Sequence, residues 1–163
     1  MTPQGARKWR PIIIAGLSTS IVAGIGTTLT AIGPWYRGLI KPSWTPPDIA
    51  FGAIWTVVFS LIAVAGYKAW IAAPTRSERA TVISVFAFNG FLNVMWSLLF
   101  FDLQRPDWAI VEVVAFWISI VVMIGTSRKH SRMAGWLLAP YLLWVSVAAF
   151  LNWEIIRLNG GFG

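Results

Sequence analysis

The sequence predicts an all-α membrane protein, a single domain over residues 1–163 that is built as a bundle of five transmembrane helices. Three observations predict this fold class. Of the 163 residues, 57% are hydrophobic and only 12% are charged, whereas about a quarter of the residues of a soluble domain are charged. The mean hydropathy is +0.69, an apolar excess that one buried core does not absorb. Five stretches also reach the length of about 20 mainly apolar residues that crosses a bilayer.

The five stretches are residues 11–30, 46–72, 78–101, 106–127 and 132–156. Prolines stand near the predicted starts of the first, second and fourth, where a missing N–H is tolerated. We expect the hydroxyl of Thr45 to cap the second helix and Asp48 to oppose its dipole. Pro140 lies inside the fifth helix instead, where it removes a backbone hydrogen bond, so we expect a kink there.

The basic residues predict the orientation. The first stretch follows basic residues as a signal peptide does, but it is long enough to span and four more stretches follow, so we interpret it as a retained helix. Nine basic residues fall on one side: Arg7, Lys8, Arg10, Lys68, Arg76, Arg79, Arg128, Lys129 and Arg132. Four fall on the other: Arg37, Lys41, Arg105 and Arg157. The richer side is expected to be cytoplasmic, which predicts a bacterial inner-membrane protein with a cytoplasmic N-terminus and a periplasmic C-terminus.

Composition excludes several classes of function. The chain has no cysteine and one histidine, His130 in a basic loop, so neither a cysteine zinc site nor a histidine-rich metal site is expected. The net charge of +7 sits in short clusters between apolar runs, which indicates contacts with lipid headgroups rather than nucleic acid. Glu112 is either a proton-relay group or a hydrated carboxylate near a helix end. Glu154 and Arg157 are expected to form an interfacial ion pair.

Polar and aromatic side chains within the spans are the candidates for a binding site. At a rise of about 1.5 Å per residue, Trp55, Asn93 and Trp144 lie roughly 12 to 18 Å below the outer ends of their helices. All three therefore belong to the outer half of the bundle, where inward-facing rings and an amide make a cavity for a flat apolar ligand. The alternative is that the asparagines join helices and the tryptophans fill the core; the residues alone leave both open.

Three segments carry a resemblance to a known family. Residues 35–47 contain the element Lys-Pro-x-Trp-x-Pro-Pro, residues 88–101 contain two asparagines one turn apart, and residues 139–152 run from Ala-Pro-Tyr to Asn. In this order they resemble the TspO/MBR family, the tryptophan-rich sensory proteins related to the mitochondrial translocator protein, also called the peripheral benzodiazepine receptor. The resemblance covers nearly the whole chain.

The resemblance implies a five-helix bundle, usually a homodimer, that binds porphyrins and synthetic isoquinoline or benzodiazepine ligands, and in some members sterols. It places the pocket under the loop between the first two helices. The implied ligand-binding positions, with the first two in the lid, are Trp44, Pro46, Trp55, Phe59, Asn89, Asn93, Trp144 and Ala148. Residues 151–157 depart from the family's proposed cholesterol motif because Trp153 replaces its tyrosine, which puts cholesterol recognition in doubt.

The leading hypothesis is therefore a membrane binding protein or sensor for a porphyrin such as protoporphyrin IX or haem, with no required cofactor. The macrocycle would stack on Trp55 and Trp144, Asn93 would supply a hydrogen bond, and Arg37 and Lys41 would pair with its propionates. One alternative is light-dependent porphyrin degradation, in which Trp55 and Trp144 would be the catalytic residues. Another is transport of a porphyrin or sterol, which a single bundle without an inverted repeat disfavours. The natural ligand, the dimer interface and the signalling output stay open.

Overall fold

The computed structural model describes residues 33–162, and all regular structure among them is helical. The elements are α2 (Pro34–Gly38), α3 (Asp48–Ala72), α4 (Arg76–Ser97), the π-helix η1 (Leu98–Asp102), α5 (Pro106–His130), α6 (Arg132–Leu137) and α7 (Ala139–Asn159). Within residues 33–162, four stretches are long and apolar enough to cross a membrane: Asp48–Ala72, Arg76–Asp102, Pro106–His130 and Arg132–Asn159. The predicted all-α, multi-pass membrane protein is confirmed at this level. The predicted first helix, 11–30, lies outside the described residues.

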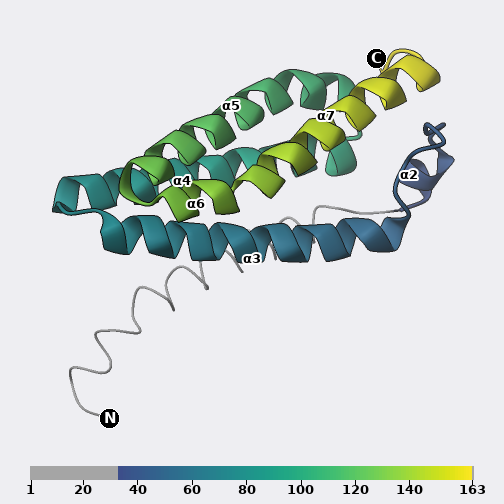
Figure 1. Ribbon diagram of the computed structural model, residues 1–163. Coiled ribbons are helices and arrows are strands. Elements are labelled where there is room, and N and C mark those ends of the chain that lie inside the picture. The colour runs from purple at the N-terminus through teal and green to yellow at the C-terminus, as the bar shows by residue number, and fades with distance from the viewer. Residues whose placement is uncertain (1–32, 163) are drawn as a thin grey trace, which may run out of the picture.

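The long helices run alternately in opposite directions along one bundle (Figure 1). Helix α2 lies at the end where α3 begins and α7 ends (Figure 1). Backbone and side-chain bonds between Ile40 and Asn159 close this end. At the opposite end, the ammonium of Lys129 lies 3.3 Å from a carboxylate oxygen of Glu78. The basic residues predicted to lie on two sides accordingly belong to opposite ends of the bundle, as far as they fall within residues 33–162.

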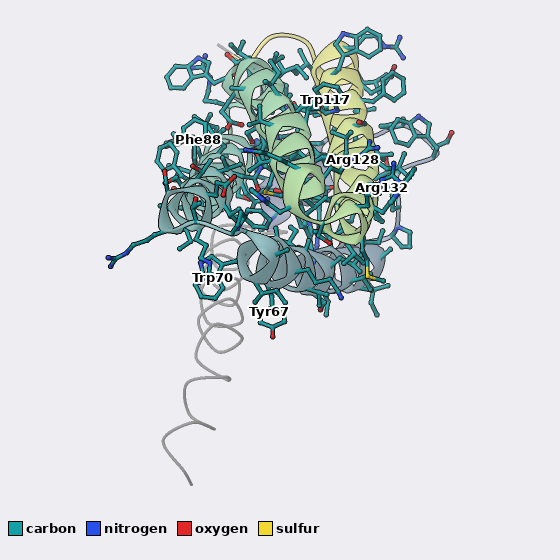
Figure 2. All side chains as sticks on the ribbon, turned by 60° about the vertical axis from the view of Figure 1, so that its left-hand side comes forward. Tyr67, Trp70, Phe88, Trp117, Arg128 and Arg132 are labelled. Carbon is teal, nitrogen blue, oxygen red and sulfur yellow. The ribbon has the colours of Figure 1, made fainter. Side chains whose placement is uncertain are left out.

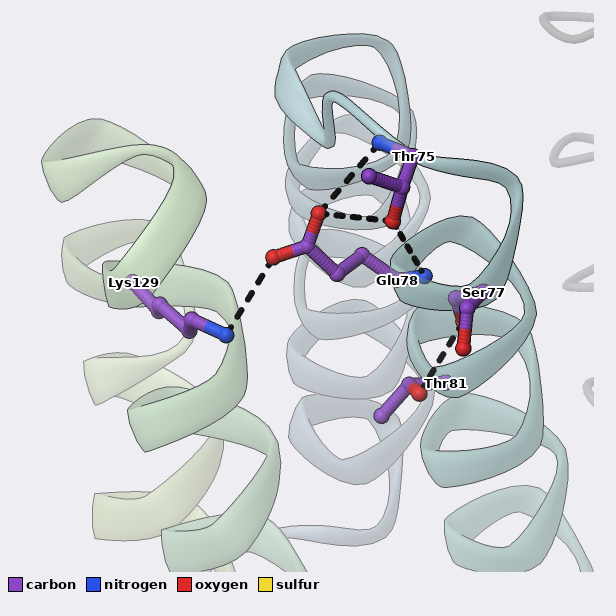
Figure 3. Close-up of polar contacts among 5 residues, drawn as sticks. All are labelled: Thr75, Ser77, Glu78, Thr81 and Lys129. Carbon is purple, nitrogen blue, oxygen red and sulfur yellow. Dashed lines mark hydrogen bonds and ion pairs between the residues drawn. The ribbon is translucent and has the colours of Figure 1, made fainter.

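Helix α4 begins two residues before its predicted start because a capping box forms there. The Thr75 hydroxyl accepts a hydrogen bond from the Glu78 N–H at 3.2 Å, and the Glu78 carboxylate accepts one from the Thr75 N–H at 3.3 Å. The same carboxylate contacts Lys129 on α5 (Figure 3). The cap thus satisfies two backbone donors and ties the start of α4 to the end of α5.

The predicted cap of the second helix is wrong. Helix α3 begins at Asp48, and its N-cap is Pro47, with no hydrogen bond from a side chain. The Thr45 hydroxyl instead donates to the carbonyl of Pro42 at 2.7 Å, within a turn of the preceding loop. Pro46 and Pro47 separate Thr45 from the helix, and the extended backbone of Pro47 postpones the first helical turn to Asp48.

Pro140 interrupts the last span, as predicted. Helix α6 ends at Leu137 and α7 begins at Ala139, with Leu138 between them at φ −90° and ψ −9°. Pro140 has no N–H to continue the bonding pattern of α6, so it occupies the first turn of a new helix, where none is needed. The change of direction is visible between α6 and α7 in Figure 1.

The centre of the bundle is held by one asparagine. Asn89 on α4 is 3% exposed. Its amide nitrogen donates to the Ser119 hydroxyl on α5 at 2.8 Å, and its amide oxygen accepts from the Tyr141 hydroxyl on α7 at 3.0 Å. The Asn89 side chain therefore joins three helices. This supports, for Asn89, the alternative that the asparagines hold helices together.

Large aliphatic side chains cover the outside of the bundle. Ile49, Val111 and Leu143 are 84%, 73% and 68% exposed, respectively. In water such a surface would be costly at about 25 cal/mol per Å² of apolar area, whereas acyl chains offer no such penalty. The buried positions where α3 passes α6 are small by contrast, since Ala65, Ala69 and Ala134 have no exposed surface.

We expect Asn89→Ala to lower the stability of the detergent-solubilised protein by about 1 to 2 kcal/mol, because it removes two interhelical hydrogen bonds and leaves their partners unpaired. Tyr141→Phe, which removes only one of the two bonds, should cost about half as much. Thermal unfolding followed by circular dichroism would measure both. Equal stability of Asn89→Ala and the parent would contradict the central role of this amide.

Candidate ligand-binding site

The site begins with an irregularity at the end of α4. In η1 the N–H of Leu103 bonds to the carbonyl of Leu98 at 2.9 Å, the i to i−5 pattern of a π-turn. Phe100 and Phe101 are both buried, and their rings meet edge to face with centroids 4.7 Å apart. Two adjacent rings in one core are uncommon on a regular α-helix, where neighbours point about 100° apart. The π-turn thereby concentrates aromatic surface at this end, and such turns are frequent at functional sites.

These two rings belong to an aromatic layer under α2. The Trp96 ring stacks on Phe100 at 5.2 Å, and Tyr36 from α2 lies on Phe101 at 5.6 Å. Trp35 meets the edge of Phe100 at 5.9 Å. Tyr36 is 3% exposed; burial, with a smaller effect of the Asp48 charge, raises the pKa of its phenol to about 12. Tyr36 is therefore neutral at any physiological pH.

The loop that carries α2 is fastened at two points. The amide of Asn159, at the end of α7, accepts from the Ile40 N–H and donates to the Ile40 carbonyl, both at 2.8 Å. The ammonium of Lys41 donates to the carbonyls of Tyr36 at 2.7 Å and Leu39 at 3.3 Å, and lies 4.6 Å from the centre of the Tyr36 ring. Lys41 thus closes the end of α2 and holds Tyr36 in the layer.

A small, partly open hollow lies beneath this loop. Its volume is about 20 Å³, and it is lined by Tyr36, Phe51, Trp96, Phe100, Phe101, Ala148, Leu151 and Asn152. The lining comes from α2, α3, α4, η1 and α7, so the hollow marks the place where the loop meets the α2 end of the bundle. Its space is only enough for one water molecule.

Trp55 and Asn89 both contact Tyr141. The Trp55 ring stacks on Phe59 with centroids 5.1 Å apart and meets the Tyr141 ring edge to face at 6.2 Å. The Tyr141 hydroxyl bonds to Asn89, and Asn93, one turn further along α4, is 3% exposed. Four predicted wall residues therefore gather on or near one buried tyrosine, beside the hollow rather than lining it.

Trp144 lies one turn beyond Tyr141 on α7 and closes the same region. Its ring meets the edge of Phe51 with centroids 5.5 Å apart, and Phe51 lines the hollow. The next turn of α7 carries Ala148, which lines the hollow itself. The indole N–H groups of Trp144 and Trp96 are buried without a hydrogen-bond partner in the described part of the chain. Buried donors normally have partners, which makes these two indole groups exceptions among the described residues.

The predicted lid residues, Trp44 and Pro46, lie in the loop between α2 and α3 and do not line the hollow. The Trp44 ring is 43% exposed and stacks on Phe150 at 5.4 Å, on the outer side of α7. Pro46 is half-buried in the loop. Beneath the loop, Tyr36 and Phe51 line the hollow.

Sequence reasoning missed Tyr36, Phe51 and the two phenylalanines of η1 as wall residues. For Phe51 a signal existed, since it lies one turn before Trp55 on the same helical face. Tyr36 stands inside the segment that carries the resemblance and is its only tyrosine. For Phe100 and Phe101 no signal existed, because a π-turn does not follow from hydrophobic periodicity.

A carboxylate lies in the same seam as Trp96. The Asn89–Ser119 bond sets the register of the antiparallel α4 and α5. Trp96 and Glu112 are each seven residues further toward the α2 end, which returns both to the face of that bond. Both oxygens of Glu112 are buried, with no hydrogen-bond partner among the described residues. The α4–α5 seam thus holds an unpaired acceptor as well as an unpaired donor.

Two further polar contacts involve α7, one of them to α5 and one within α7 itself. The amide of Asn152, with its nitrogen turned toward α5, donates to the Pro106 carbonyl at 3.1 Å and accepts from the Ile110 N–H at 3.2 Å. The predicted pair between Glu154 and Arg157 is present, with a shortest N–O distance of 2.6 Å. The Asn152 contacts tie the Ala148–Asn152 wall of the hollow to α5.

Comparison with known proteins identifies this architecture. The TspO/MBR family model matches residues 12–158. The tryptophan-rich protein TspO of Chlorobaculum tepidum is 38% identical over 125 residues, 77% of this chain and 79% of that protein. The TspO of Archaeoglobus fulgidus is 38% identical over 137 residues, 84% and 88% of the two chains. The translocator protein of Sus scrofa is 32% identical over 160 residues, 96% and 94% of the two chains. Both the family model and these relatives extend over most of the sequence, and the chain therefore belongs to the TspO/MBR family.

Proposed function

We propose that this protein binds porphyrins and related tetrapyrroles in the aromatic region beneath the α2 loop. The observation that carries the proposal is the pair of buried indole N–H groups, on Trp96 and Trp144, that have no partner in residues 33–162. Trp96 lines the aromatic hollow, and Trp144 contacts Phe51, which also lines it. Flat apolar walls with a few polar anchors suit a planar macrocycle. Membership of a family with tryptophan-rich sensory proteins agrees with this assignment.

Binding requires the hollow to open. Pockets for ligands of this size measure about 300 to 1,000 Å³, against about 20 Å³ here. The Phe51 ring separates the hollow from Trp144, and the loop above is held to α7 by exposed hydrogen bonds between Ile40 and Asn159. Solvent-exposed bonds of this kind open at low cost. Release of the loop and rotation of Phe51 would join the hollow to the space beside Trp55 and Trp144.

The two basic residues of the loop take different parts in this proposal. Arg37 is exposed and makes no ion pair among the described residues, so its guanidinium is available to a propionate. The Lys41 ammonium already donates hydrogen bonds to two carbonyls and makes a cation–π contact with the Tyr36 ring. Lys41 therefore acts on binding by holding the loop, and Arg37 by contacting a carboxylate.

The membrane assignment is refined by the distribution of charge. We infer that the end with Arg76, Arg79, Arg128, Lys129 and Arg132 is cytoplasmic, following the positive-inside rule. The α2 loop and the ligand site then face the periplasm of a bacterial inner membrane. A tetrapyrrole would reach the site from that side.

We expect Trp144→Phe and Trp96→Phe each to weaken protoporphyrin IX binding about three- to tenfold, because a ring is kept while one hydrogen-bond donor is lost. Quenching of protein fluorescence by added porphyrin would give the dissociation constants. Trp108→Phe is the matched control, since Trp108 is 52% exposed and lies under Arg105 rather than beside the hollow. Equal affinities of all three variants and the parent would remove the indole donors from the proposal.

Substitutions in the loop should separate charge from structure. Arg37→Gln is expected to weaken the binding of protoporphyrin IX by about three- to tenfold and to leave the binding of a neutral isoquinoline ligand unchanged. Only the porphyrin carries carboxylates, so only the porphyrin loses an ion pair with Arg37. Lys41→Gln should weaken both ligands, since it loosens the loop. Displacement of a fluorescent ligand in detergent measures both. A neutral ligand that is as sensitive to Arg37→Gln as the porphyrin would refute the ion pair.

Light-dependent degradation of the porphyrin at the same site is the second candidate. It is favoured by Trp96, which stacks on Phe100, which in turn meets Trp35 near the surface. An indole beside a photoexcited macrocycle can donate an electron to it, which leaves an indole radical cation and a reduced macrocycle. Neighbouring rings can pass the electron hole outward, and dissolved oxygen would be the oxidant that opens the macrocycle. Illumination of the protein–protoporphyrin complex should then yield a new absorbing product that is absent in the dark and reduced in Trp144→Phe. Identical spectra of lit and dark samples would leave binding alone.

A further inference from the structure

Arg128 and Arg132 lie side by side at the end of the bundle opposite α2 (Figure 2), are both exposed, and have no carboxylate partner within residues 33–162. Arg128 lies in the last turn of α5, and Arg132 is the first residue of α6. The basic residues that form ion pairs within residues 33–162 are Lys129, Arg105 and Arg157. Both guanidinium groups therefore keep their charge and their hydrogen-bond donors available.

The position of Arg128 is built into the packing of α6. Gly135 is buried, and a Cβ atom at this position would lie 1.9 Å from Cγ and 2.8 Å from Cδ of Arg128. The absence of a side chain at Gly135 thus makes a groove for the stem of Arg128. The stem leads the guanidinium to within 5.9 Å of the centre of the Trp136 ring. An arginine placed over an indole in this way keeps the edge of its guanidinium open to another partner.

Arg132 lies on the same surface. It precedes Trp136 by four residues on α6 and therefore shares its helical face. Figure 2 shows Arg128 and Arg132 together at the end of the bundle that faces the viewer. Trp136 is 69% exposed and Met133 beside it is 58% exposed, so a pair of cationic groups borders exposed apolar surface at the ends of two membrane-spanning stretches.

We propose that Arg128, Arg132 and Trp136 form a binding site for the headgroup of an anionic phospholipid. The phosphate would bridge the two guanidinium groups, which match its geometry with paired N–H donors. Trp136 and Met133 would contact the glycerol and the first acyl carbons, as aromatic residues do at membrane interfaces. A lipid fits this site for two reasons. The site combines positive charge with apolar surface, and it lies where spanning helices end, at the depth at which anionic headgroups attract basic side chains. This site is separate from the ligand site at the α2 end.

The test compares two lipids of equal chain length, phosphatidylglycerol and phosphatidylcholine, on the purified full chain in a neutral detergent at physiological salt. Native mass spectrometry reports the apparent affinity for each lipid. We expect the parent to prefer phosphatidylglycerol about tenfold or more, and Arg128→Gln and Arg132→Gln each to reduce the preference about fivefold. Gly135→Ala should reduce it similarly although no charge is lost, because the new methyl group displaces the stem of Arg128.

Arg76→Gln is the matched control, since it removes one exposed charge from the same end of the bundle outside the proposed site. Its lipid preference should equal that of the parent. An Arg76→Gln loss as large as that of Arg128→Gln would show a general surface charge and overturn the site. A parent without preference for the anionic lipid would overturn it as well. Thermal unfolding of Gly135→Ala without lipid confirms that the variant is folded, and Arg128→Gln keeps the test decisive if it is not.

Discussion

A buried polar group in a lipid-embedded bundle must find its partner within the protein, because the surrounding acyl chains offer none. Asn89 meets this constraint with both ends of its amide, toward Ser119 and toward Tyr141. The two bonds set the register of α4 against α5 and α7. The aromatic residues toward the α2 end follow from that register, since Trp96 continues the Asn89 face of α4 and Trp144 continues the Tyr141 face of α7.

The two ends of the bundle are organised by different physical effects. At the α2 end, aromatic rings from four elements line a small hollow, and the loop above them is held by a few exposed hydrogen bonds. Exposed hydrogen bonds of this kind open at low cost. At the other end, charge dominates: a capping box and an ion pair join α4 to α5, while Gly135 seats the stem of an arginine.

Much of the fold followed from the pattern of apolar residues. Length and hydropathy predicted the four described spans to within three residues at each end, because lipid requires long, uncharged helices whatever their packing. Pro140 also predicted the break between α6 and α7, because a proline lacks the N–H needed to continue the helical hydrogen bonds at its own position. The cap at Thr45 was wrong because the two prolines that follow it prolong the extended backbone, and the early start of α4 followed from a capping box that hydropathy does not register.

The sequence by itself determined that the chain is helical, crosses the membrane several times, separates its basic residues into two unequal sets, and carries buried amides and indoles toward one end. Periodicity and charge are local properties, so they can be read without knowing which helices touch. Only the tertiary structure decided that Tyr36 and Phe51 rather than Trp44 and Pro46 border the hollow, that Lys41 holds the loop, and that Arg128 lies over Trp136. These depend on a π-turn, on the path of a loop and on contact between helices far apart in the chain, none of which leaves a periodic signal in the sequence.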